Sequence, residues 1–368
     1  MRKGLVLAVL LGIVMLFATV ASAASTTSVQ LYSVQQGGKF GFIDNRGKLV
    51  IKPQFDAVEE FSEGRAKFRT GTNPATKYGY IDTSGKVVVQ PIYDSAMDYH
   101  EGVATVMIFE DSRLVTRLID SNGKTVLELQ ESFAFVFNEG LAAYFERNPF
   151  TSYDGEARLY GFMNKKGKVV IEPTYVYKPM WGIPVFSEGL AAVRVDDRWG
   201  YINTKGEAVI PTQYEQAGAF NGGLAAIQND QGLWGFIDKK GKVVIKPQFE
   251  DAMAFNEGLA PVMVTRKGKE RWGFIDKKGK FVIQPQYQSV DNFSEGLAPV
   301  NFGDSAKESW GYINTKGKTA IKAQFTYAEP FRGGVARVTT EAKANDELDG
   351  QPVGYINKQG KYIWKPSK

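Results

Sequence analysis

The sequence predicts an all-β protein, a tandem repeat array of nine antiparallel three-stranded meander units in an open curved or superhelical stack. Two observations predict this fold. Residues 234–262 return almost letter for letter as residues 272–300, and weaker copies fill most of the remaining chain. Each copy also holds short runs of β-branched and aromatic residues bounded by Gly, Asp, Asn and Pro, a composition typical of strands joined by tight turns.

An apolar residue just before an Asp or Asn gives the register of the repeat. It recurs nine times at steps of 38, 38, 44, 39, 35, 38, 38 and 43 residues. The nine anchors are Ile43, Ile81, Ile119, Met163, Ile202, Ile237, Ile275, Ile313 and Ile356. A unit of this size cannot bury its own hydrophobic faces, so we expect its stability to come from stacking on its neighbours.

Two motifs accompany the anchor. An aromatic-Gly pair such as Trp272-Gly273 precedes it, although the third copy reads Thr116-Arg117 and the last reads Val353-Gly354. The second motif is aromatic-x-Glu-Gly-x-Ala, for example "FSEGLA" at Phe293. In these residues the chain resembles the WG repeat (KWG) family of bacterial proteins over roughly residues 31–366. The resemblance implies a β-rich repeat and no defined activity.

Each unit contains three expected strands in a fixed order. In the fifth unit the first covers residues 190–195 and the second covers residues 199–203, and the sixth unit shows the third at residues 242–245. The turn between the second and third strands reads "DKKGK" or "NTKGK", in which the Asp or Asn side chain can bond the backbone and the Gly supplies a positive φ. Pro247 is expected to end the third strand because it cannot donate to the ladder.

The spacing within a unit separates a constant part from a variable part. The distance from the paired Gly to the aromatic residue of the second motif is 20 residues in seven of eight copies, whereas the distance from the first strand to that Gly runs from 10 to 20. Variable loops on a constant scaffold are typical binding elements. The loops that join the first two strands cover residues 69–77, 107–116, 145–159, 265–271, 302–309 and 339–352.

Lysines collect at the hairpin tips, which should lie on the edge opposite those loops. The tip lysines are Lys165, Lys166, Lys168, Lys239, Lys240, Lys242, Lys277, Lys278, Lys280, Lys316 and Lys318. One interpretation is a solvated edge that discourages edge-to-edge aggregation. The alternative is attraction to an anionic polymer of the cell envelope.

The two end units bear on whether the array is open. Residues 31–34 precede Gly41 at the same spacing as in the fifth unit, and the last unit is complete as well. Closure by strand exchange would split one unit between the termini, so the sequence favours an open array. A closed β-propeller is the alternative, because a short fourth strand in "QFEDA" would give propeller-sized blades.

The N-terminus predicts export. Residues 1–23 combine a basic start, an apolar run and the Ala21-Ser22-Ala23 cleavage signal of a secretory signal peptide; an uncleaved anchor is the alternative. Residues 24–30 form a polar lead-in, and residues 31–368 form the array. The absence of Cys excludes disulfides and anchoring through a lipidated Cys. The full chain carries a net charge of +5.

The chemistry of the chain argues against an enzyme. His100 is the only histidine, with no Ser or Cys nucleophile motif around it, and one His cannot build a zinc site. Carboxylates recur once per unit, whereas an active site occurs once, and Asp alternates with Asn as a turn-capping residue would. We therefore expect no cofactor and no metal. A glycan-active hydrolase that uses paired carboxylates is the catalytic alternative.

The predicted function is an exported, non-catalytic scaffold that binds a protein or an anionic cell-wall polymer through its variable loops. We expect no nucleic-acid partner and no membrane span after signal cleavage. The candidate contact residues are Trp181 and Tyr177, in the connector insertion, and Tyr153, Asp154 and Arg158, in the longest loop. A structural spacer of the cell envelope without a discrete site is the alternative. The paired aromatic rings are expected to lie in the core, with sugar stacking as the alternative.

Overall fold

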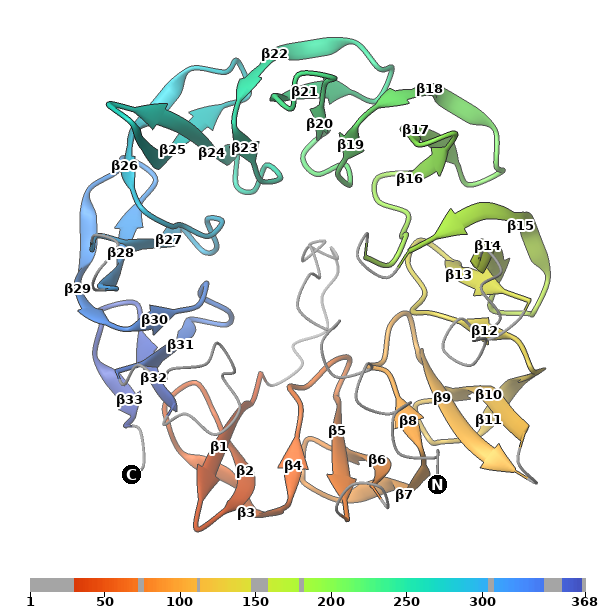
Figure 1. Cartoon of the computed structure of the whole chain (residues 1–368). Helices are drawn as coiled ribbons and strands as arrows, with labels where there is room; N and C mark the ends of the chain where they lie inside the picture. The colour runs from red at the N-terminus through yellow and green to blue at the C-terminus, as the bar shows by residue number, and fades with distance from the viewer. Residues whose placement is uncertain are drawn as a thin grey trace, which may run out of the picture. The chain divides into compact units, whose positions relative to one another are not determined.

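A computed structural model describes residues 30–71, 76–110, 113–146, 158–178, 182–303, 308–340 and 353–365. Within these ranges the regular elements are strands, grouped into nine antiparallel sheets that we call blades 1 to 9 (Figure 1). The chain divides into two compact units. The first unit covers residues 1–44 and 49–212, and the second covers residues 45–48 and 213–368.

The strands follow the blades in chain order. Blade 1 holds β1 (Tyr32–Gln36), β2 (Lys39–Ile43) and β3 (Leu49–Phe55); blade 2 holds β4 (Ala57–Val58), β5 (Arg65–Thr70), β6 (Lys77–Asp82) and β7 (Val87–Tyr93); blade 3 holds β8 (Ser95–Ala96), β9 (Val103–Glu110), β10 (Arg113–Asp120) and β11 (Thr125–Gln130). Blade 4 holds β12 (Phe133–Ala134), β13 (Leu141–Phe145), β14 (Arg158–Asn164) and β15 (Val169–Tyr177); blade 5 holds β16 (Leu190–Val195), β17 (Arg198–Asn203) and β18 (Ala208–Tyr214).

The remaining blades repeat this order. Blade 6 holds β19 (Gln216–Ala217), β20 (Leu224–Gln228), β21 (Trp234–Asp238) and β22 (Val243–Phe249); blade 7 holds β23 (Asp251–Ala252), β24 (Leu259–Arg266), β25 (Lys269–Asp276) and β26 (Phe281–Tyr287). Blade 8 holds β27 (Leu297–Asn301), β28 (Trp310–Asn314) and β29 (Thr319–Phe325); blade 9 holds β30 (Tyr327–Ala328), β31 (Val335–Thr339), β32 (Val353–Asn357) and β33 (Tyr362–Trp364).

Most blades are four-stranded, which corrects the expected three-stranded unit. The three long strands lie where the sequence predicted them, except that the third strand does not end at its Pro: β22 runs two residues past Pro247 to Phe249. Six blades also add a two-residue strand in front of the first long strand. The backbone N–H two residues before the motif aromatic donates to the first long strand, as Met253 does to the Pro261 carbonyl at 3.0 Å. Blade 5 has Pro184 at this position, so the donor is missing and the short strand does not form.

The paired glycines give the third strand room within their own blade. A Cβ on Gly273 would lie 2.6 Å from the Ile283 carbonyl oxygen and 2.7 Å from the Pro285 nitrogen. The ladder between β25 and β26 shifts register at this position, as at a β-bulge. The Gly is therefore required by the close approach of the third strand of its own blade. The ring itself is core as predicted, because Trp272 is only 8% exposed.

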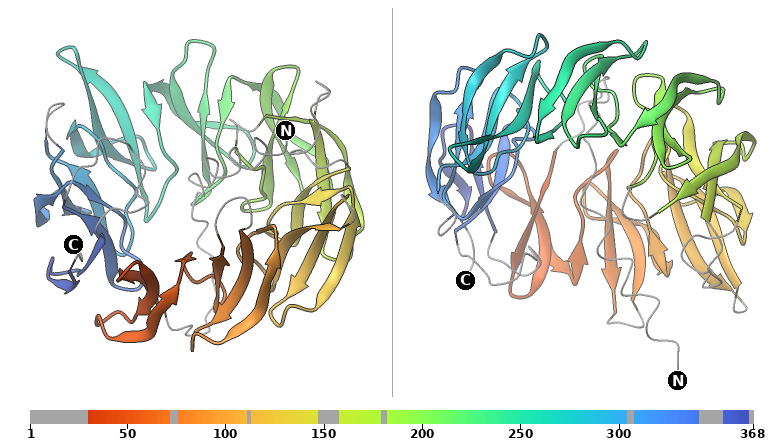
Figure 2. Two further views of the ribbon diagram at one scale, coloured as in Figure 1. Left: turned by 60° about the horizontal axis from the view of Figure 1, so that its bottom comes forward. Right: turned by 45° about the horizontal axis from the view of Figure 1, so that its top comes forward.

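Aromatic pairs connect consecutive blades. In most blades the ring after the paired Gly packs on the aromatic ring of the next motif, as Phe274 packs on Phe293 with centroids 4.9 Å apart. The same pairing joins Phe236 to Phe255 at 4.8 Å. These rings are buried, so the core of the protein lies between successive blades as well as within them. Figure 2 shows the twisted sheets of blades 6 and 7 in two further orientations.

The predicted open stack is wrong, and the arrangement is that of a nine-bladed β-propeller. Within each compact unit, the hairpin between the second and third long strands packs on the third strand of the preceding blade; a Cβ on Gly279, for example, would meet the Ile245 side chain. The hairpin of blade 1 does the same with blade 9, where a Cβ on Gly47 would collide with the Ile363 carbonyl oxygen. Blades 1 and 9 therefore contact each other without strand exchange, which is why two complete end units did not imply an open array.

Candidate functional surfaces

The antiparallel registers define two rims of each blade. In blade 7, Leu259 pairs with Asp276 at one end of the sheet and Arg266 pairs with Lys269 at the other. The end that holds the loop between the first and second long strands is called the loop rim. The end that holds the Asp/Asn hairpin and the aromatic-x-Glu-Gly turn is called the hairpin rim. The strand pairings place these connections as predicted in each blade.

Each hairpin on the hairpin rim is fixed by its Asp or Asn. Asp238 Oδ1 accepts hydrogen bonds from the backbone N–H of Lys240 (2.9 Å) and Lys242 (3.0 Å). Asn314 Oδ1 accepts the equivalent bonds from Lys316 (3.0 Å) and Lys318 (3.1 Å). Asp and Asn are interchangeable here because only one acceptor oxygen is used, so the predicted turn-capping role is confirmed.

The Glu of the aromatic-x-Glu-Gly turn links consecutive blades, a role that sequence reasoning missed. Glu63 has a φ of 49°, and its two carboxylate oxygens accept the backbone N–H groups of Glu101 (2.7 Å) and Gly102 (2.8 Å) in the next turn. Glu139 accepts the N–H of Gly189 at 2.8 Å in the same way. The recurrence of Glu63, Glu101 and Glu139 at steps of 38 residues was visible in the sequence, but the partner of each Glu was not.

Some hairpin lysines reinforce these links. Lys165 forms an ion pair of 3.1 Å with Glu101, and Lys358 forms one of 2.9 Å with Glu295. Lys277 donates to the carbonyl oxygen of Gly222 at 2.5 Å, at a turn where Gly replaces the Glu. A few lysines on this rim therefore contribute to blade packing and are not simply solvated.

Blade 2 carries a buried cation between two carboxylates. Lys67 Nζ lies 2.9 Å from Glu59, 3.6 Å from Asp98 and 2.9 Å from the Ala96 carbonyl oxygen. Burial raises the pKa of Glu59, and Lys67 only partly offsets this effect. Burial alone would lower the pKa of Lys67, but Asp98 and Glu59 outweigh it and raise that pKa. The ammonium group therefore stays charged and holds the two carboxylates together.

Blade 9 has an ion pair at the equivalent position. Arg337 lies 3.5 Å from Glu329, and burial raises the pKa of Glu329. The pKa of Asp291 in the preceding turn is also raised by burial. Most other blades carry apolar or small residues here, for example Met253 beside Pro261. The geometry resembles a structural ion pair rather than an acid–base couple. Among the described residues, no group of three or more His, Asp or Glu is placed to hold a metal ion.

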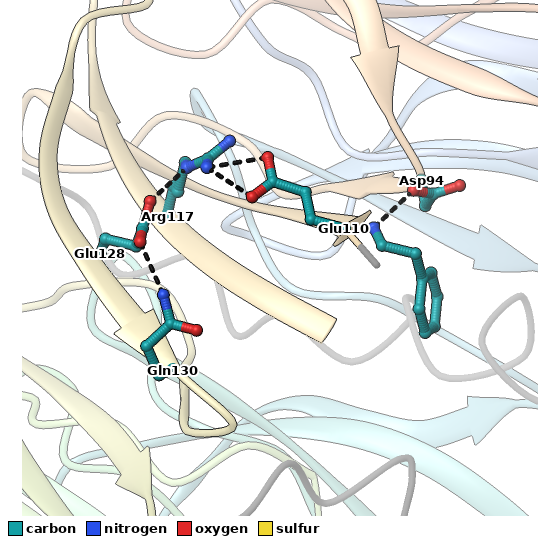
Figure 3. Close-up of polar contacts among 6 residues, drawn as sticks. Asp94, Glu110, Arg117, Glu128 and Gln130 are labelled. Atoms are coloured by element: carbon teal, nitrogen blue, oxygen red, sulfur yellow. Dashed lines mark hydrogen bonds and ion pairs between the residues drawn. The ribbon is translucent and has the colours of Figure 1, made fainter. Parts of the chain in front are cut away.

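Blade 3 replaces the paired Gly by Arg117 and builds an ion-pair network around it (Figure 3). Its third strand lacks Pro and pairs regularly at this point, so a side chain fits. Arg117 contacts Glu110 at 2.9 Å and Glu128 at 2.7 Å, and Glu128 accepts a bond from Gln130 at 2.7 Å. The hydrogen bond from Arg117 lowers the pKa of Glu128. This network stiffens the long hairpin of β9 and β10.

An exposed aromatic ring lies at the end of that hairpin. Phe109 is 52% exposed, and its backbone N–H donates to Asp94 Oδ2 at 3.0 Å (Figure 3). Asp94 in turn accepts a bond from Lys77 at 2.7 Å. Blade 3 therefore presents an apolar ring on the loop rim from a braced backbone.

A hollow of about 220 Å³ lies on the loop rim where blade 4 meets blade 5. Its apolar lining comes from Val176, 37% exposed, and Val195, 43% exposed. Its charged lining includes Lys178 and the Arg194–Asp197 pair, whose atoms approach to 3.2 Å. The hollow combines apolar contacts with both signs of charge, which suits a polypeptide partner better than a single small ion.

Two of the predicted contact residues, Tyr177 and Arg158, lie on the strands beside this hollow, but not as expected. Tyr177 is only 4% exposed, packs on Phe145 with ring centroids 5.2 Å apart, and has its pKa raised by burial. Arg158 is partly buried and pairs across the strands with Tyr177. Trp181, Tyr153 and Asp154 lie outside the described residues. The hollow was not predicted, because it depends on how two blades meet.

A model of the WG containing repeat family matches residues 40–71, 78–108, 117–148, 160–199, 199–232, 234–267, 272–304 and 310–343. The chain belongs to the WG containing repeat family. Each matched segment of this WG repeat protein begins near the second long strand of one blade and ends at or beyond the first long strand of the next. The family repeat is therefore offset from the blade, and eight repeats connect nine blades.

One solved structure shows a likeness in fold. The crystal structure of "the eukaryotic initiation factor" matches with a TM-score of 0.56 and 10% identity, over 94% of this chain and 91% of that chain. The crystal structure of BamB from Moraxella catarrhalis matches with a TM-score of 0.43 and 11% identity, over 74% of this chain and 87% of that chain. No curated protein matches in sequence. Among the described residues, no helix has the length and apolarity needed to span a membrane.

Proposed function

We propose that this WG repeat protein is an exported, non-catalytic scaffold that binds a protein partner on the loop rim of its first compact unit. The observation that carries the proposal is the hollow between β15 and β16, which exposes Val176 and Val195 beside charges of both signs. Arg158, at the start of β14, and Tyr177, at the end of β15, pair at this same end of blade 4. The N-terminal 23 residues support export, as their basic, apolar and small-residue segments are those of a signal peptide.

Phe109 supports the same rim as the binding surface. Aromatic residues held on a rigid backbone are typical anchors of protein interfaces, because little conformational entropy is lost when they are buried. The Arg117 network and the Asp94 bond brace the hairpin that presents Phe109. A spacer without a binding site would have no use for these features, and that alternative is an outcome of the test below.

The test places a photo-crosslinking residue at position 195 and, as a control, at position 209. Val195 is 43% exposed on the loop rim, and Val209 is 39% exposed on β18 beside the hairpin rim of the same blade. In the producing cells, position 195 is expected to capture a discrete protein, and position 209 is not. A third protein carries the photo-crosslinking residue at position 109. In that protein, Val195→Glu should abolish crosslinking to the partner, whereas Val209→Glu should not. Equal capture at both positions, or none, would favour the spacer.

A further inference from the structure

The hairpin rim of the second compact unit is strongly basic. The hairpins of blades 6 to 9 follow one another and carry ten lysines beside two aspartates. All ten lysines are exposed: Lys239, Lys240, Lys242, Lys277, Lys278, Lys280, Lys316, Lys318, Lys358 and Lys361. Packed sheets lie about 10 Å apart, which is also about the screening length at 0.1 M salt, so the fields of neighbouring hairpins overlap.

The carboxylates on this rim are held by the backbone and do not neutralise the lysines one for one. Asp276 Oδ1 accepts the N–H groups of Lys278 and Lys280, both at 2.9 Å. Glu257 accepts the N–H of Gly296 at 2.9 Å. Glu295 accepts the N–H of Gly334 and pairs with Lys358. Much of the negative charge is thus bound to N–H dipoles, whereas the lysine side chains are exposed, with Lys277 and Lys358 also bonded to neighbouring turns.

The fold does not require these lysines. The hairpins of blades 2, 3 and 5 form the same turn with three lysines and three carboxylates in total, and are neutral. Asp82 bonds Ser84 at 2.9 Å and Lys86 at 3.1 Å, the same pattern as Asp238. Blade 4 is the exception in the first unit, with three lysines, of which Lys165 is paired with Glu101. A dense cluster of like charges that the turn does not need points to an anionic ligand.

We propose that the hairpin rim of the second unit binds a linear polyanion that carries phosphate or sulfate groups. Lysine ammonium groups act as point-charge donors to such groups and tolerate a flexible chain. A polyanion that runs along several hairpins would release its condensed counterions, which makes binding favourable and salt-dependent. The site lies on another unit and another rim than the proposed protein-binding hollow, so the two proposals stand or fall separately.

The test replaces lysines with the residues that other hairpins of this chain carry at the equivalent positions. The hairpin variant is Lys240→Ser, Lys278→Asn and Lys316→Ser, after Ser84 and Asn122 at the equivalent positions. The control variant removes the same three charges elsewhere in the second unit, by Lys246→Gln, Lys269→Gln and Lys322→Gln, all at exposed positions away from the hairpins. The ligands are long-chain polyphosphate, dextran sulfate and uncharged dextran. Circular dichroism and thermal melts check that all proteins are folded.

Wild-type protein and the control variant are expected to bind the two charged polymers alike and to ignore dextran. The hairpin variant should weaken binding by about tenfold or more at 0.1 M salt and reduce the slope of log K against log salt by about 2, at roughly 0.7 per lost contact. Comparison of the two charged polymers shows whether phosphate or sulfate is preferred. An equal loss in both variants would mean that net charge alone is responsible, and an unchanged hairpin variant would place the site elsewhere; either result overturns the proposal.

Discussion

The carboxylate of Glu257 accepts a hydrogen bond from the backbone N–H of Gly296, with Oε2 and N 2.9 Å apart. Glu257 lies in the turn between β23 and β24 of blade 7, and Gly296 lies in the turn just before β27 of blade 8, so this bond joins two blades. Glu257 adopts a φ of 50°, a left-handed conformation that costs energy for any residue with a Cβ. The recurrence of this strained Glu at equivalent turns indicates that the interblade bond offsets the strain.

Substitutions at Glu257 should separate the bond from the strain. Glu257→Ala keeps the strain and removes the bond, so it should lower the free energy of unfolding by about 1–2 kcal/mol. Glu257→Gln retains an acceptor and should cost less than Ala. Glu257→Gly also loses the bond but relieves about 1 kcal/mol of strain, so it should fall near wild type. Urea unfolding measures all three, and an Ala variant as stable as wild type would contradict the role of the bond.

Lys67→Met should destabilise blade 2 in a pH-dependent way. At pH 7 the variant removes the cation that lies between Glu59 and Asp98, at a cost of about 3 kcal/mol, the low end for a buried pair because Glu59 is 45% exposed. Since burial raises the pKa of Glu59, that carboxyl protonates early as the pH falls, and the deficit relative to wild type should shrink towards pH 4.

Alkaline pH tests the charge on Lys67 itself. Its pKa is raised in the folded protein, so its stabilising effect is present below the usual lysine pKa and is lost as the pH rises through the raised value. The wild-type advantage over the Met variant should therefore decline only in strongly alkaline solution. Unfolding curves across the pH range measure this, and a deficit that does not vary with pH would contradict the assigned charges.

The paired Gly should tolerate a side chain only where the third strand leaves room. Gly273→Ala places a Cβ 2.6 Å from the Ile283 carbonyl oxygen, so the two strands must separate, with a loss of about 3 kcal/mol or more. Arg117 occupies the same position in blade 3, where the strands pair without a register shift. Arg117→Ala should lower the free energy of unfolding by only about 1 kcal/mol, because the ion pairs that it removes are partly exposed to solvent. Denaturant unfolding compares the two, and similar losses would contradict the explanation by backbone approach.

The repeat allowed the sequence to predict local structure well. Asp238 and Asn314 were recognised as turn caps because Asp and Asn exchange at one position, and Trp272 was recognised as core because an aromatic ring recurs at its position in seven of the nine copies. The bond from Glu63 to the next blade was missed. The repeat shows that a Glu recurs at this position, but it does not show which backbone groups that Glu contacts. The ion pair of Lys67 had a sequence signal, a Lys where most copies carry a small or apolar residue, but its acidic partners come from two different turns.

The open array was predicted because closure was expected to need a strand exchanged between the end units. In the structure, the hairpin of blade 1 instead packs on blade 9. Both end units are complete, which excludes strand exchange but says nothing of a hairpin lying against a neighbouring strand. The hollow beside Val195 was beyond the sequence for a related reason: its walls belong to two blades, and its volume depends on how they meet. The variable loop lengths drew attention to the loop rim, but the position of the hollow on that rim followed only from the structure.

The contact between the first and last blades gives the sharpest test of the propeller arrangement. Gly47 and Gly258 have nearly the same φ, 80° and 82°, so Ala at either position should incur the same left-handed strain of about 1–2 kcal/mol. A Cβ at Gly258 meets nothing within 4 Å, whereas a Cβ at Gly47 collides with the backbone of Ile363. Gly47→Ala should therefore cost about 2 kcal/mol more than Gly258→Ala in equilibrium unfolding, and it should expose the C-terminal strand to limited proteolysis. Equal losses in the two variants would mean that the hairpin of blade 1 does not pack on blade 9 in solution, and the arrangement would have to be open there.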